Sequence, residues 1–187
     1  MLKPLFTAAS LALLAACSGM SSTPSKSPSA MPAFSQAALP AAVQVPAGNK
    51  VAMETVGVGE ITYQCREKQD AMGQHEWVFV GPKATLNDRR GTAVGSYYGP
   101  PATWENRDGS KVTATQVAVA PAGAGNIPYQ LVKANPAMGQ GTMTGVTYIQ
   151  RVATKGGVAP AMACDAPARG RNEIVRYQAD YIFWKAI

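Results

Sequence analysis

Aromatic and acidic side chains gather in one short stretch of the chain, YYGPPATWENRDGS, which begins at Tyr97. Planar rings beside carboxylates can stack on sugar rings and accept hydrogen bonds from sugar hydroxyls. The stretch also contains Gly, Pro and Asp-Gly turn signals, so it predicts a pair of loops, and loops on a rigid β scaffold often hold binding residues. The candidate ligand-binding residues are Tyr97, Tyr98, Trp104, Glu105 and Asp108, together with His75 from an earlier segment.

The same stretch has a second interpretation, which we favour. The aromatic rings fill the hydrophobic core, and Asp108-Gly109 forms the turn of a hairpin. The substitution Trp104→Ala distinguishes the two interpretations. A core residue would lose stability when truncated, whereas a binding residue would lose binding and leave stability unchanged.

No motif indicates a catalytic nucleophile, a metal or a cofactor. His75 is the only histidine; it could act as a general base, but a single histidine beside Glu76 at a strand edge is typical of a surface residue. There is no GxSxG or CxxC sequence, and VGVGE lacks the third glycine of a dinucleotide fingerprint. Glu76, Glu105, Asp108 and Asp180 could supply a glycosidase pair, which requires a defined separation in space. We therefore expect a non-catalytic protein without cofactors, and a glycan hydrolase is the alternative.

The first of three cysteines stands in a targeting signal. Lys3 is followed by an apolar run of about a dozen residues, which is typical of a secretory signal and is too short for a transmembrane helix. The run ends in LAAC at Cys17, which resembles the bacterial lipobox. This resemblance implies cleavage before Cys17, attachment of lipid to its thiol, and anchoring to a membrane. Ser18, rather than Asp, favours the outer membrane.

The other two cysteines, Cys65 and Cys164, are predicted to form a disulfide. An exported protein folds in an oxidising compartment, where two cysteines of one small domain commonly pair. The alternative is two separate thiols.

Composition divides the mature chain into a tether and a domain. Residues 17–48 are rich in Ser, Pro and Ala, which predicts a flexible tether, and residues 49–187 suit a single domain. The net charge of +6 is spread over scattered basic residues. Without a basic helix or an RNA-binding aromatic motif, this charge does not indicate nucleic-acid binding.

Apolar alternation with a period of two predicts a mainly β domain. Frequent Gly and Pro turns between short strands favour a β-sandwich or a small β-barrel with long loops. A short helix at 82–87 is the one helical possibility. Arg151 and Asp180 lie among apolar strand residues, which favours a structural ion pair. The predicted strands are residues 59–67, 75–81, 110–120, 129–134, 145–154 and 172–186.

Several motifs between residues 56 and 183 resemble the DUF3455 family of uncharacterised exported bacterial and fungal proteins. The matching sequences are GVGEITYQC, WVFVGPKATL, TWENRDGSKV, GVTYIQRVATKGGVAP and VRYQADYIF. The resemblance implies an exported or envelope-attached single domain and supplies no catalytic residues. We expect a lipid-anchored envelope protein that binds a glycan, a lipid or another protein.

Overall fold

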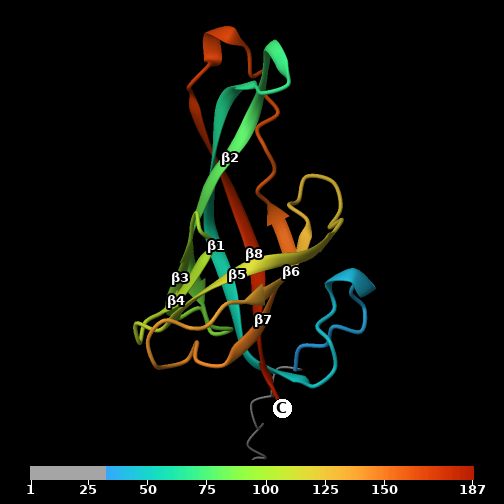
Figure 1. The fold of residues 1–187 in the computed structure, drawn as a ribbon, viewed down its shortest axis with the longest axis vertical. Coiled ribbons are helices and arrows are strands. Elements are labelled where there is room, and N and C mark those ends of the chain that lie inside the picture. Colours follow the sequence, from blue (N-terminus) through green and yellow to red (C-terminus); the bar gives the residue numbers. More distant parts are fainter. Residues whose placement is uncertain (1–32) are drawn as a thin grey trace, which may run out of the picture. The chain divides into compact units, whose positions relative to one another are not determined.

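Eight antiparallel strands pair in chain order, and the last pairs with the first, so the sheet closes into a barrel (Figure 1). The structure is a computed structural model that describes residues 33–187. The predicted signal peptide (1–16), the lipidation residue Cys17 and the first part of the predicted tether lie outside the described residues. The elements are η1 (Ala41–Val43), β1 (Asn49–Lys68), β2 (Ala71–Asn87), β3 (Ala93–Tyr98), β4 (Thr103–Asn106), β5 (Lys111–Ala120), β6 (Tyr129–Ala134), β7 (Val146–Gly156), η2 (Ala166–Ala168) and β8 (Asn172–Ala186).

The predicted mainly β domain is confirmed. In β8 the alternation places Tyr177, Ala179, Tyr181 and Phe183 in the barrel interior, where each is buried. Inward residues from all eight strands form this interior core, because alternate side chains of a strand point to opposite faces of the sheet. Close packing inside depends on Gly57, since a Cβ at this position would lie 2.5 Å from Cε2 of Tyr181.

The helix considered for residues 82–87 is wrong, because this segment is the last part of β2. Ala84 and Leu86 alternate into the core, while Lys83 and Thr85 are exposed. Residues expected to be loops form the short strands β3 and β4, which complete the barrel wall between β2 and β5.

Strands β1 and β2 continue beyond the barrel as a hairpin arm, residues 65–77, where β1 no longer pairs with β8 (Figure 1). The strand β3 pairs only with Lys83–Asn87 of the much longer β2. The earlier part of β2 therefore has β1 as its strand partner, and the two strands extend together as a hairpin. The disulfide predicted between Cys65 and Cys164 is confirmed, with a Cα–Cα distance of 5.5 Å. It joins the arm to the segment between β7 and β8, and Cys65 is fully buried.

Residues 34–45, the last part of the predicted tether, lie against the outer surface of the barrel. We call this segment the strap. Val43 is fully buried and Val45 is 4% exposed, and both pack with Ile182 and Trp184 of β8. The tether prediction therefore extends too far towards the C-terminus, since the compact unit begins at Phe34. The composition of this segment did not predict an ordered structure, because its few apolar residues stabilise it only when they pack on the outer face of the barrel.

Polar contacts fix the strap to the barrel. The buried side chain of Gln150 donates from Nε2 to the carbonyl of Val43 (2.6 Å) and accepts at Oε1 from the indole N–H of Trp184 (2.9 Å). At the start of the strap, the backbone N–H of Phe34 donates to Glu54 (3.2 Å). These bonds satisfy polar groups that would otherwise be costly to bury.

Arg89 connects two carboxylates on the outer face of the barrel. Its guanidinium lies 2.8 Å from Glu54 and 2.6 Å from Asp180. The ion pair expected between Arg151 and Asp180 is therefore wrong. Asp180 faces outwards with the alternate residues of β8, whereas Arg151 is directed towards the barrel interior with Ile149.

Candidate functional site

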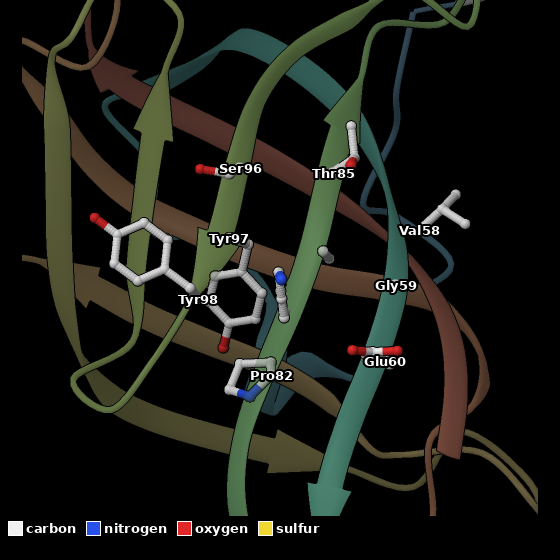
Figure 2. Close-up of a pocket in the computed structure, with 10 residues that line it drawn as sticks. Val58, Gly59, Glu60, Pro82, Thr85, Ser96, Tyr97 and Tyr98 are labelled. Carbon is white, nitrogen blue, oxygen red and sulfur yellow. The ribbon is translucent and has the colours of Figure 1, made fainter. Parts of the chain in front are cut away.

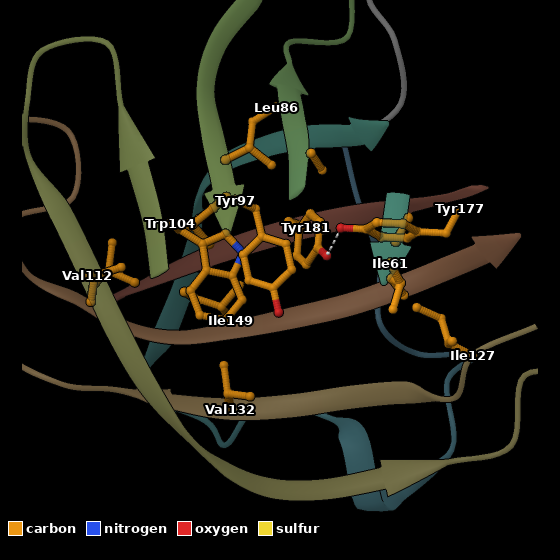
Figure 3. Packing of buried hydrophobic residues seen from close by; sticks show 14 of the residues in the cluster. Ile61, Leu86, Tyr97, Trp104, Val112, Ile127, Val132, Ile149, Tyr177 and Tyr181 are labelled. Atoms are coloured by element: carbon orange, nitrogen blue, oxygen red, sulfur yellow. Dashed lines mark hydrogen bonds between the residues drawn. The ribbon is translucent and has the colours of Figure 1, made fainter. Parts of the chain in front are cut away.

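Tyr97 and Trp104 lie inside the barrel, where they are 6% and 1% exposed. They face each other across the β3–β4 pair, and their rings stack with centroids 4.6 Å apart. The ring of Tyr181 lies 5.0 Å from that of Tyr97 (Figure 3). The three rings form one wall of the interior, and such contacts stabilise a core beyond the area that they bury.

Two further tyrosines extend this aromatic interior. The hydroxyl groups of Tyr177 and Tyr181 lie 3.1 Å apart (Figure 3), and the hydroxyl of Tyr63 donates to the carbonyl of Gly157 at 2.8 Å. Burial raises the pKa of Tyr63, Tyr177 and Tyr181 above its ordinary value, as it does for Tyr97. All of these phenols are therefore neutral at physiological pH.

A cavity of about 230 Å³ opens at the end of the barrel from which the hairpin arm extends. We call it the mouth cavity. Aromatic rings and aliphatic groups supply most of its wall, and two amides and one guanidinium supply its polar groups. Its lining residues are Phe79, Pro82, Tyr97, Gly99, Pro100, Ala102, Trp104, Ala114, Gln116, Gln130, Val132 and Arg151.

Arg151 is the charged residue of the mouth cavity. Its Nε and Nη2 donate to one carbonyl, that of Pro128, at 3.2 and 3.0 Å. Within residues 33–187 it has no carboxylate within ion-pair distance. Its positive charge lowers the pKa of Tyr63 and of Tyr97 and so partly offsets the rise caused by burial. The guanidinium is therefore close enough to influence the phenols of the barrel interior.

Trp104, whose side chain lines the mouth cavity, contains an unpartnered polar group. The indole N–H of Trp104 is buried and has no hydrogen-bond partner in the described part of the chain. A buried donor without an acceptor costs about 1–3 kcal/mol. Nearby, Gln130 Nε2 donates to Gln116 Oε1 at 2.6 Å. The Oε1 atom of Gln130 and the Nε2 atom of Gln116 take no part in this bond.

Tyr98 and Glu105 lie on the outer surface and bond to each other. The phenol of Tyr98 donates to Glu105 at 2.7 Å, and this bond raises the pKa of the phenol. Tyr98 borders a surface groove of about 570 Å³. Figure 2 shows this groove spread over β1, β2 and β3, with Ser96 and Tyr98 on one side and Val58 and Glu60 on the other.

Asp108 organises the turn between β4 and β5. Its carboxylate accepts hydrogen bonds from the Ser110 hydroxyl (2.5 Å), the Ser110 backbone N–H (2.9 Å) and the Thr142 backbone N–H (2.7 Å). These bonds, first that from the Ser110 hydroxyl, hold the pKa of Asp108 well below its usual range. Asp108 thus ties the loop before β7 to the barrel and is not part of the mouth cavity.

His75 lies on the hairpin arm, where it pairs with Glu67 of β1. It is not among the residues that line the mouth cavity. Of the six predicted site residues, the structure therefore brings together only Tyr97 and Trp104 at this cavity. Among residues 33–187, no cluster of His, Cys, Asp or Glu could hold a metal ion, and no helix is long and apolar enough to cross a membrane.

Sequence reasoning missed Phe79, Gln116, Gln130 and Arg151 as site residues. The sequence did contain a signal for Arg151. It lies two residues after the apolar Ile149 in the same strand, so both side chains point to the same face. A charged side chain directed inwards is unusual unless it has a partner or a function.

A family model described as a protein of unknown function, DUF3455, matches residues 46–185. The chain belongs to the DUF3455 family. The match covers the eight strands of this DUF3455 protein except the last residue of β8, and it begins within the last residues before β1. No curated protein and no solved structure matches the chain.

Proposed function

We propose that this DUF3455 protein is a lipid-anchored protein of the bacterial envelope that binds a small ligand in the mouth cavity without transforming it. The observation that supports this proposal is a partly open cavity whose wall combines stacked aromatic rings with unpaired polar groups. Binding sites for small molecules are typically concave and mostly apolar, with a few polar groups that orient the ligand.

The size of the mouth cavity sets the size of its ligand. Eight-stranded barrels are just wide enough to be filled by side chains or to hold one small ligand. An apolar cavity of about 150 Å³ admits benzene, and the mouth cavity measures about 230 Å³. A ligand with a single ring and one substituent therefore fits, while a glycan chain would contact the mouth only with a terminal unit.

The positions of the carboxylates support binding over hydrolysis. Glycoside hydrolysis commonly uses two carboxyl groups about 5–10 Å apart on either side of the scissile bond. No Asp or Glu lines the mouth cavity. Glu105 is bonded to Tyr98 on the outer surface, and Asp108 accepts two hydrogen bonds from Ser110 and one from Thr142.

The proposed anchor is the lipidated thiol of Cys17. The strap begins at Phe34, so residues 17–33 would connect the lipid to the barrel. These seventeen residues could span at most about 60 Å when fully extended. The mouth cavity would then remain near the membrane that holds the protein.

The anchor is tested with the variant Cys17→Ser, expressed in a bacterium that processes lipoproteins. The wild-type protein is expected in the membrane fraction, and mass spectrometry should find a diacylglyceryl thioether on Cys17. The variant is expected to lose the lipid and to appear in the soluble fraction. Membrane association of the variant at the wild-type level would contradict the anchor.

Binding is tested by screening single-ring compounds against a soluble form that begins after Cys17. Gln116→Trp adds a large side chain to the wall of the mouth cavity, and Thr115→Trp, at the exposed neighbouring position, is the matched control. Compounds that bind the wild-type protein should bind the control equally and the blocked variant weakly. Compounds that bind all three proteins equally, or an absence of binding compounds, would contradict the proposal.

A further inference from the structure

We infer that the mouth cavity selects an anionic ring compound, whose carboxylate or phosphate group pairs with Arg151 while its ring packs against Tyr97 and Trp104. This inference rests on the proposed function and defines the chemical class of its ligand. The charge, the unused donors and the shape of the cavity support this ligand class.

Arg151 retains most of its hydrogen-bonding capacity. A guanidinium has five N–H donors, and only Nε and one Nη2 hydrogen are used, both on the carbonyl of Pro128. The remaining three donors have no carboxylate partner among the described residues. The planar fork of a guanidinium matches the two oxygens of a carboxylate or a phosphate, so an oxyanion is the natural partner.

The rest of the wall offers nothing that would neutralise this charge. The lining residues include no Asp or Glu. The phenol of Tyr97 stays protonated because burial raises its pKa. Between partly desolvated walls a positive charge is screened less than in water, so the cavity favours an anion over a cation or a neutral group of the same size.

The apolar part of the wall specifies the body of the ligand. The stacked rings of Tyr97 and Trp104 line the cavity with Pro100, and the half-exposed Phe79 lines it next to the hairpin arm. Flat rings pack favourably against such surfaces in stacked or edge-to-face geometry. A small inorganic anion such as phosphate would leave this apolar surface uncovered. The ligand class therefore combines a ring with an oxyanion.

The inference is tested with four probes of similar size: benzoate, phenyl phosphate, benzamide and benzyl alcohol. Their dissociation constants are measured by calorimetry for the wild-type protein and for Arg151→Met. Arg176→Met, which removes an exposed arginine from β8, is the matched control. A charge-assisted hydrogen bond corresponds to a difference of about tenfold to a hundredfold in affinity. Wild type and control should show this preference for benzoate or phenyl phosphate over the neutral probes, and the preferred anion identifies which oxyanion the site takes.

Arg151→Met should abolish the preference while retaining the affinity for benzamide. The unchanged binding of the neutral probe also shows that the variant is folded. If Arg151→Met does not fold, Arg151→Lys replaces it; this variant keeps the charge but loses the fork, and the preference should fall without disappearing. Equal affinities for anionic and neutral probes in the wild type, or a preference that survives Arg151→Met, would overturn the inference and leave the proposed function standing. Failure of all four probes to bind would count against both.

Discussion

Trp104 provides the sharpest test of how the barrel interior is built. The side chain is 1% exposed, stacks on Tyr97 and meets the ring of Tyr181 edge-on at 5.9 Å between centroids. Truncation of a buried Trp to Ala costs about 3–5 kcal/mol, and lost aromatic contacts add about 0.5–1.5 kcal/mol. The new void would join the mouth cavity, so water could enter and the wall would lose support on one side. We expect Trp104→Ala to lower the free energy of unfolding by about 4 kcal/mol.

The measurement is urea denaturation followed by circular dichroism on a soluble form that begins after Cys17. Thermal denaturation should show a matching fall of about 2–4 °C for each kcal/mol. Tyr98→Ala is the control, because Tyr98 comes from the same segment but is 37% exposed and has one exposed hydrogen bond. It should cost less than about 1 kcal/mol. A loss below about 1 kcal/mol for Trp104→Ala, or equal losses for both variants, would refute the packing described above.

Three further predictions concern the disulfide, a turn and the strap. Replacing Cys65 and Cys164 by Ser opens a covalent loop with a sequence separation of 99 residues. In the chain-entropy description, urea denaturation should then show a free energy of unfolding lower by about 4–5 kcal/mol. An unchanged free energy of unfolding would contradict this prediction. The depressed pKa of Asp108 contributes stability above the unfolded pKa of about 4, and this contribution is lost as the pH falls towards the folded pKa. Urea midpoints between pH 2 and 7 should therefore vary less with pH for Asp108→Asn than for the wild type, and identical profiles would contradict the assignment. Gln150→Leu should lower the free energy of unfolding by about 2–4 kcal/mol, because it leaves the Trp184 indole N–H and the Val43 carbonyl without partners. The backbone amides of the strap should also exchange hydrogen faster. Unchanged exchange would contradict the attachment of the strap through Gln150.

The strands could be predicted where their apolar alternation was regular. The alternation over residues 172–186 predicted the last strand, and β8 spans Asn172–Ala186. The strands β3 and β4 could not be recognised, because they are short and the Gly and Pro residues between them are typical of loops. Their pairing is stabilised by the Tyr97–Trp104 contact across the two strands, which is a tertiary effect.

The strap and the mouth cavity lay beyond what the sequence could establish. The strap resembles a disordered linker in composition, and its stability depends on the outer face of β7 and β8, including Gln150 and Trp184. The cavity exists because the sheet closes, which brings Phe79 of β2 to the same opening as Gln130 of β6 and Arg151 of β7. Closure fixes contacts between residues far apart in the chain, and no local pattern specifies them.

The most direct test of ligand binding in the mouth cavity is the measurement of intermolecular nuclear Overhauser effects from the tightest-binding single-ring compound. We expect contacts from the ring protons of the compound to the side chains of Phe79, Tyr97 and Trp104. Contacts instead to Tyr98 and Val58 on the outer groove, or to residues of the strap, would show that the ligand binds elsewhere and would contradict binding in the mouth cavity.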